Sequence, residues 1–176
     1  MRYASSLAVL TAVFVAGCGG SGGDSGPGNP PVTVPPPDLA ISSGNSMQVL
    51  QVAYLTASES GDMAGLVTNT GMETLYSYLT SQTLDAGVSP SPSTMTASGT
   101  ADSSELGGVV EYSTPTMFQA FDHDHPSSGE LLVTGANGAT VRLIVIDNVD
   151  IRIEFDSDGM APPDETIDTT WVAFTS

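Results

Sequence analysis

The chain has 176 residues and a formal net charge of −17, from 20 acidic residues against three basic ones. This balance argues against nucleic acid as a partner, because phosphate recognition depends on clustered Lys and Arg. An anionic lipid surface would also repel the chain unless divalent cations bridged the two. Cys18 is the only cysteine, so no intramolecular disulfide is available and burial of a core must hold the fold.

The first 17 residues have the three parts of a secretory signal. Arg2 gives a minimal basic start, an apolar run from Leu7 to Ala16 comes next, and small residues precede Cys18. The run is too short to span a bilayer, which takes about 20 apolar residues. Residues 1–17 are therefore predicted to be a signal peptide.

The spacing Val15-Ala16-Gly17-Cys18 resembles the lipobox of bacterial lipoprotein precursors. The resemblance implies diacylglyceryl transfer to the Cys18 sulfur, cleavage after Gly17 and acylation of the new amino terminus. Two or three acyl chains would anchor the protein stably, at about 0.8 kcal/mol per buried CH₂. Gly19, in place of Asp, implies the cell outer membrane by resemblance to sorted lipoproteins, with the periplasmic or surface face left open. The alternative is an ordinary signal peptide with an unrelated cysteine near the cut.

Residues 18–37 are predicted to be a tether. They are almost entirely Gly, Ser, Pro, Asn and Asp, and contain too few apolar groups to fold. At about 5–6 Å times the square root of its length, the tether would hold the rest of the chain roughly 25 Å from the lipid. Residues 38–176 remain as a single domain, long enough to bury a core.

Helical patterns open this domain. Ser42-Ser43 precede apolar residues spaced by three and four over residues 47–57, which predicts an amphipathic helix with a serine N-cap. A second helical pattern covers residues 72–79. Residues 88–93, with two prolines, are expected to end the helical part.

From about Leu106 the apolar period changes to two and β-branched residues dominate, which indicates strands. Asn137-Gly138 predicts a hairpin, because both residues tolerate the positive φ angles of a type I′ turn. The predicted fold class is α+β, with one or two N-terminal helices packed on a twisted antiparallel β-meander sheet. The expected strands are Val109-Ser113, Met117-Asp122, Glu130-Thr134, Thr140-Ile146, Asp150-Asp156 and Ile167-Phe174.

The length of the turn at Asp147-Asn148 decides which face of its two strands is buried. A two-residue turn would place Arg142 across from Ile153. A three-residue turn that includes Val149 places Arg142 opposite Glu154, where a cross-strand ion pair contributes about 0.2–1 kcal/mol. We predict the three-residue turn, which gathers the apolar residues of both strands on one face: Val141, Leu143, Val145, Ile151, Ile153 and Phe155.

A partial calcium loop is the main candidate site. Asp156-Ser157-Asp158-Gly159 looks like a damaged DxDGDG loop, in which Met160 and Ala161 replace the expected carboxylate and glycine. Calcium takes six to eight oxygen ligands, usually with carboxylates at alternate positions around a glycine. The alternative is a solvated acidic hairpin loop. The candidate ligands are Asp156, Asp158, Asp164 and Glu165.

The segment from about Phe118 to the end carries a second resemblance. Its motifs are Pro126-Ser127-Ser128-Gly129, Thr134-Gly135-Ala136-Asn137-Gly138, Asp156-Ser157-Asp158-Gly159, Asp164-Glu165-Thr166 and Thr169-Thr170-Trp171. This pattern is similar to the C-terminal part of uncharacterised β-rich lipoproteins of Gram-negative bacteria. The resemblance implies a β fold and no particular activity.

Two further groups of residues have alternative roles. In Asp122-His123-Asp124-His125, the histidines would share a face of a strand and could hold a transition metal with a third ligand, or lie in an exposed loop. Trp171 with Phe174 is expected to anchor the last strand in the core, with sugar stacking as the alternative. The sequence contains no HExxH pair, and the GxSxG pattern occurs only at residues 19–23, inside the predicted tether.

These features favour a membrane-tethered envelope lipoprotein with a non-catalytic binding or structural role toward a protein or glycan of the envelope. One alternative is a calcium-responsive adhesion domain. Another is a hydrolase that acts on a polysaccharide through paired carboxylates, which would require a deep pocket with two facing carboxylates.

Overall fold

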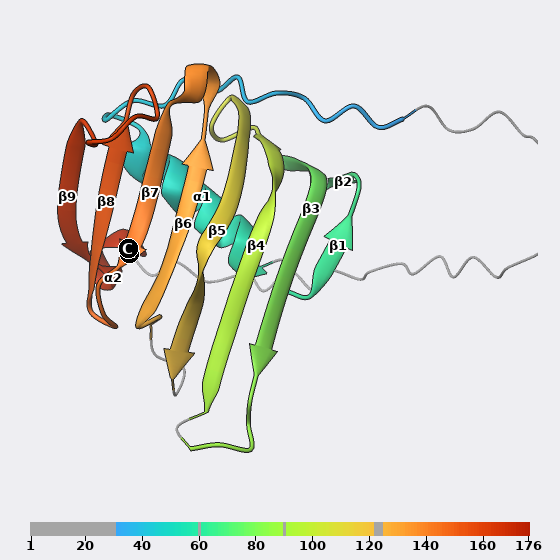
Figure 1. The fold of residues 1–176 in the computed structure, drawn as a ribbon. Coiled ribbons are helices and arrows are strands. Elements are labelled where there is room, and N and C mark those ends of the chain that lie inside the picture. The colour runs from blue at the N-terminus through green and yellow to red at the C-terminus, as the bar shows by residue number, and fades with distance from the viewer. Residues whose placement is uncertain (1–30, 60, 90, 122–124) are drawn as a thin grey trace, which may run out of the picture. The chain divides into compact units, whose positions relative to one another are not determined.

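One helix lies across a nine-stranded antiparallel sheet in the part of the chain that the structure describes (Figure 1). This structure is a computed structural model, and it describes residues 31–59, 61–89, 91–121 and 125–176. The predicted signal peptide, Cys18 and most of the tether lie outside these residues. The predicted α+β class and the antiparallel meander are confirmed.

The strands succeed one another across the sheet in the order β1-β3-β4-β5-β6-β7-β8-β9, and β2 also pairs with β3. The strands are β1 Met63–Gly65, β2 Thr68–Asn69, β3 Glu73–Leu84, β4 Pro92–Ser103, β5 Gly108–Phe121, β6 Ser128–Thr134, β7 Thr140–Val145, β8 Asp150–Asp156 and β9 Glu165–Thr170. The helical elements are α1 Ser46–Glu59, the short 3₁₀ helix η1 Ala136–Gly138 and α2 Trp171–Phe174.

Helix α1 confirms the first predicted helix and buries one face against the sheet. Val49, Leu50, Ala53 and Ala57 are at most 3% exposed. At the predicted serine cap, the carbonyl of Ser42 accepts the amide of Ser46 at 2.9 Å, while its hydroxyl donates to Asn45 Oδ1 at 3.2 Å. In the turn before the helix, Asn45 Oδ1 accepts the amide of Ser42 at 2.8 Å.

The second predicted helix is wrong, because residues 73–79 form the first part of β3 and residue 72 lies in the bend before it. A bulge at Ser77, whose φ is 46°, shifts the register with β4. Leu75 and Tyr78 are therefore both buried although they are three residues apart, which imitates helical spacing. Met72 and Leu79, expected on one helical face with Leu75 and Tyr76, are 59% and 53% exposed.

The next two strands also differ from the prediction. Of residues 88–93, the described residues 88, 89 and 91 lie in the loop of a β3–β4 hairpin and 92 and 93 begin β4, which was not predicted. Strand β5 runs through Pro115 and joins two predicted strands, 109–113 and 117–122, into one. Register shifts on both sides of Thr116 accommodate this proline, which cannot donate to the sheet.

The three-residue turn between β7 and β8 is confirmed. Arg142 lies opposite Glu154, and the amide of Ile146 donates to the carbonyl of Asp150 at 3.0 Å. The ion pair of Arg142 differs from the expectation: its Nη1 lies 3.9 Å from a carboxylate oxygen of Glu130, on β6. The predicted apolar face is buried, except that Phe155 is partly exposed.

The predicted hairpin at Asn137-Gly138 is also confirmed. Both residues have positive φ, 59° and 81°, and the amide of Ala139 donates to the carbonyl of Ala136 at 3.1 Å. The loop is longer than a two-residue turn, because β6 ends at Thr134 and β7 begins at Thr140.

The last predicted strand ends early. Strand β9 stops at Thr170, whose hydroxyl accepts the amide of Ala173 at 3.2 Å and caps α2. The short helix turns Trp171 and Phe174 inward, where they are 0% and 1% exposed. Their predicted role as core anchors is confirmed.

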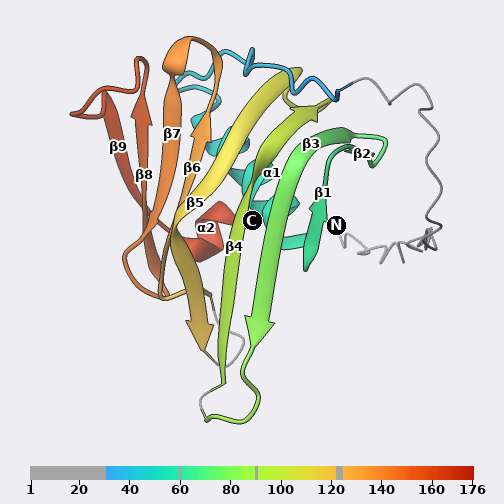
Figure 2. The same cartoon turned by 45° about the vertical axis from the view of Figure 1, so that its right-hand side comes forward.

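The core lies between α1 and the sheet face that it crosses, as Figure 2 shows from a second side. Both views show the ends of β3, β4 and β5 running on past the helix (Figures 1 and 2). None of the described helices is long and apolar enough to cross a membrane.

Candidate functional site

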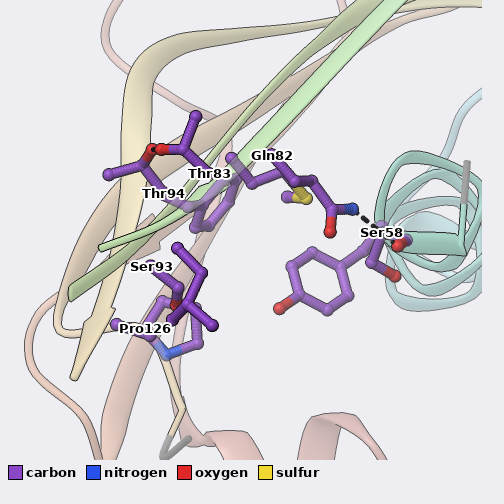
Figure 3. Close-up of a pocket in the computed structure, with 11 residues that line it drawn as sticks. Ser58, Gln82, Thr83, Ser93, Thr94 and Pro126 are labelled. Atoms are coloured by element: carbon purple, nitrogen blue, oxygen red, sulfur yellow. Dashed lines mark hydrogen bonds between the residues drawn. The ribbon is translucent and has the colours of Figure 1, made fainter. Parts of the chain in front are cut away.

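A pocket of about 390 Å³ lies where the sheet extends beyond α1 (Figure 3). Its floor comes from β3, β4 and β5, and one wall comes from the second half of the helix. The described lining residues are Tyr54, Ser58, Gln82, Thr83, Leu84, Ser93, Thr94, Met95, Phe118, Ala120 and Pro126.

Strand register explains why these side chains share a face. Leu84 pairs with Ser93, and Ser93 pairs with Ala120 on the next strand. One step toward the helix, Met95 lies between its partners Gln82 and Phe118. Because α1 ends at Glu59, the outermost row of the sheet has no helix above it.

Gln82 joins the end of the helix to the sheet. Its Nε2 donates to the carbonyl of Ser58 at 2.7 Å, drawn as a dashed line in Figure 3. Its backbone amide donates to Oδ1 of Asp62, also at 2.7 Å. The first bond holds the side chain of Gln82 between the sheet and the helix, and the second holds its backbone. Neither involves its Oε1, which has no hydrogen-bond partner among the described residues.

Tyr54 forms the aromatic wall of the pocket. Its ring lies 5.7 Å from that of Phe118, 5.4 Å from that of Trp171 and 5.9 Å from that of Phe174. Burial raises the pKa of Tyr54 to about 12, so the side chain is a neutral phenol at physiological pH. Its hydroxyl has no hydrogen-bond partner among the described residues and can donate to a ligand or accept from it.

The two threonines of the lining turn their side chains to the opposite face of the sheet. The hydroxyls of Thr83 and Thr94 lie 2.5 Å apart, and Figure 3 shows them beyond the strands. The hydroxyl of Ser58 donates to the carbonyl of Leu55 at 3.1 Å. Within the described lining, the polar groups without a partner are therefore the Tyr54 and Ser93 hydroxyls and Gln82 Oε1.

A second hollow, of about 360 Å³, lies between α1 and the C-terminal residues. Tyr54 and Phe174 line it, and Glu105 gives it a carboxylate. Gln51 crosses this hollow, with its Nε2 donating to the carbonyl of Phe174 at 2.5 Å. Tyr54 therefore separates two hollows, of which only the first opens onto the uncovered end of the sheet.

The predicted calcium ligands lie in the β8–β9 loop, and three of them bind groups of the loop itself. Asp156 Oδ1 accepts the amides of Asp158 and Gly159 at 3.0 and 2.9 Å. Asp158 Oδ1 accepts the amide of Met160 at 3.0 Å. Asp164 Oδ2 accepts the amide of Ser157 at 2.8 Å and its hydroxyl at 2.5 Å.

Those two bonds from Ser157 lower the pKa of Asp164. Glu165 begins β9 and pairs with Phe155 across the sheet. No three His, Cys, Asp or Glu side chains of the described residues are grouped as a metal site. Calcium binding by this loop stays a prediction.

The histidine motif lies partly outside the described residues, which exclude His123 and its two Asp neighbours. His125 is described, and its ring stacks on that of Trp171 with centroids 5.5 Å apart and planes inclined by 12°. The indole Nε1 of Trp171 donates to the carbonyl of Pro126 at 3.1 Å. Because Trp171 is fully buried, it offers no face for sugar stacking.

The pocket was missed by sequence reasoning because only the β5 part of its floor lies in a predicted strand, 117–122. Residues 82–84 lie beyond the predicted helix and were assigned to no element, and β4 was not predicted. Two signals for the β3–β4 hairpin were present: the Asp85-Ala86-Gly87 turn sequence, and threonines at positions 80, 83, 94 and 96 on either side of it. Neither signal identifies a cavity, which depends on where the helix ends over the sheet.

Comparisons with models of known protein families, with curated proteins and with solved structures found no match.

Proposed function

We propose that this chain is an exported, lipid-anchored envelope protein whose folded part binds a small ligand without converting it chemically. The pocket between α1 and the ends of β3, β4 and β5 is the binding site. The observation that carries the proposal is the set of three unpartnered polar groups, on Tyr54, Gln82 and Ser93, that converge on one open pocket.

The dimensions and lining of the pocket support a binding role. Its volume falls at the lower end of the range of about 300–1,000 Å³ typical of small-molecule sites. Apolar side chains alternate with a few polar groups, as such sites require. The serine hydroxyls of the described lining have no histidine or carboxylate beside them to act as a base, which favours binding over covalent catalysis.

The position of the first residue after the predicted tether supports attachment of the folded part through that tether. The amide of Asp38 donates to the carbonyl of Val109 at 3.1 Å, and its Oδ1 accepts the amide of Val109 at 2.7 Å. These bonds fix the predicted end of the tether to the start of β5. Phe118 and Ala120, in the pocket, lie near the other end of the same strand.

Metabolic labelling tests the anchor. The full chain, expressed in a Gram-negative host with an alkyne analogue of palmitate, should be labelled and recovered with the membranes. Cys18→Ser should lose the label, because the acylated sulfur is gone, whereas Ser21→Ala in the tether should keep it. A label that persists in Cys18→Ser, or an unlabelled wild type, contradicts the anchor.

Fluorescence tests the pocket. The uncharged probe N-phenyl-1-naphthylamine should gain fluorescence on binding the purified full chain that carries Cys18→Ser. Ser93→Trp should abolish the gain by filling the pocket. Thr94→Trp is the matched control, because this neighbouring side chain lies on the opposite face and should leave the signal intact. Equal signals from both tryptophan variants would contradict a binding role for the pocket.

A further inference from the structure

We infer that the ligand of this pocket is a neutral saccharide the size of a mono- or disaccharide. The inference rests on the proposed binding function and specifies its ligand class. Three properties of the pocket lead to it: its charge, the kind of polar group that it leaves unpaired, and its apolar surface.

The lack of charged side chains in the described part of the lining favours a neutral ligand. The described lining contains no Asp, Glu, Lys, Arg or His. A cation would find no carboxylate in this lining, and an anion would find no basic side chain there. The net charge of the whole chain, −17, further repels anions.

The unpartnered polar groups match the hydroxyl groups of a sugar. The hydroxyls of Tyr54 and Ser93 can each donate and accept, and Gln82 Oε1 accepts only. A sugar hydroxyl also donates and accepts, so it can pair with all three. A purely apolar ligand would leave these groups without water or a partner, which weakens binding for each group that it desolvates.

Apolar side chains complete the match. Leu84, Met95 and Pro126 line the pocket beside the ring of Tyr54. A pyranose ring carries C–H groups on its faces and hydroxyls around its rim. It can therefore lie against these side chains while its rim reaches the polar groups, and Gln82 is already held in place by its bond to Ser58.

Saturation-transfer NMR tests the inference on the full chain carrying Cys18→Ser. The neutral probes are methyl β-glucoside and N-acetylglucosamine, and the charged probes are glucuronate and glucosamine. We expect transfer to the neutral sugars, competition between them, and much weaker transfer to the charged ones. Equal transfer to glucuronate would overturn the argument from charge.

Substitutions at the polar groups locate the binding. Tyr54→Phe and Ser93→Ala should each weaken sugar binding about two- to tenfold, as expected for one lost hydrogen bond. Gln82→Leu should also weaken it, provided that its melting curve shows a folded chain. The matched controls Thr83→Val and Thr94→Val, on the opposite face, should bind as the parent does. Sugar binding that none of the pocket variants weakens would overturn the inference.

The naphthylamine probe distinguishes a wrong ligand class from a wrong binding function. If it binds in the pocket while no neutral sugar does, the ligand class is wrong and the binding function stands. If neither binds, both the proposed function and the inference fail.

Discussion

Trp171 holds the end of the last strand against the helix. Its side chain is fully buried between Tyr54 and His125, and its indole N–H has a partner in the carbonyl of Pro126. We expect Trp171→Ala to lower the free energy of unfolding by about 3–5 kcal/mol, because it leaves a large cavity and an unpaired carbonyl. Urea denaturation followed by circular dichroism measures this loss.

The neighbouring residue gives the control for this prediction. Val172 is 70% exposed, so Val172→Ala should change the free energy of unfolding by less than about 0.5 kcal/mol. Similar losses in the two variants would show that Trp171 contributes no more than a surface residue.

The side chain of Glu73 is half-buried against α1, and this burial destabilises its charged form. Its two oxygens accept the hydroxyl of Thr56 at 3.0 and 2.8 Å. Burial raises the pKa of Glu73, and the nearby charges of Glu105 and Glu59 raise it further, against the lowering effect of the bond from Thr56. The folded chain therefore binds this proton more tightly than the unfolded chain does.

The stabilising contribution of Glu73 is consequently largest at low pH and is lost as the pH rises through its pKa in the folded state. Glu73→Gln keeps an acceptor for Thr56 and removes the charge. We expect this variant to be more stable than the wild type at pH 7, with a difference that shrinks as the pH falls through the raised pKa and disappears below 4.5, the ordinary pKa of the group. Urea denaturation at pH 7 and pH 4 tests this, and a less stable variant at pH 7 would refute it.

Among the elements, the β8–β9 loop depends on its own carboxylates. The hydroxyl and amide of Ser157 both bind Asp164 and lower its pKa, so this group stabilises the fold above its ordinary pKa of 3.8. That contribution is lost as the pH falls through the pKa in the folded state. Asp164→Asn should lower the melting midpoint at pH 7 and have little effect near pH 2.

A carboxylate outside the loop provides the comparison. Asp102 is exposed on β4, and Asp102→Asn should leave the midpoint at pH 7 nearly unchanged. If the two variants melt alike, Asp164 does not stabilise the loop. The same melts in millimolar calcium and in chelator test the calcium hypothesis, because an ion that binds the folded state must raise the midpoint. Curves that superimpose would contradict it.

The strands that sequence reasoning placed correctly are those with strong apolar alternation. In β7 and β8 the alternation and the turn length fixed one register, and Arg142 does lie opposite Glu154. Strand β3 failed because its apolar residues follow helical spacing in the sequence, although Leu79 is exposed and the buried Tyr78 lies outside that pattern. Strand β4 failed because its buried positions are small or polar, such as Ala97, Ala101 and Ser103, and carry no hydrophobic pattern.

The pocket could not be predicted for a different reason. Its residues come from a helix and three strands, and Tyr54 lies far in sequence from Phe118 and Pro126. The cavity exists because α1 ends before the strands beneath it do. That mismatch in length is a property of tertiary packing, which no local pattern records.

At the scale of the whole molecule, β5 connects the tether to the pocket. Asp38 is hydrogen-bonded at the first residues of β5, whereas the pocket lies toward its last ones. A 14-residue strand spans about 45 Å at about 3.3 Å per residue. On a chain anchored through Cys18, the pocket should therefore lie at the end of the folded part that is farther from the lipid.

Energy transfer to an acceptor dye in the lipid tests this orientation. On a chain whose Cys18 sulfur is lipidated as proposed, an introduced cysteine would be the one reactive thiol. Ser104, exposed in the β4–β5 turn, lies at the tether end, and Val88, 51% exposed in the β3–β4 loop, lies at the pocket end. A donor on Ser104→Cys should transfer more efficiently than one on Val88→Cys. Equal transfer would mean that the folded part tumbles freely, and the opposite order would place the pocket against the membrane, where access from the aqueous phase is restricted.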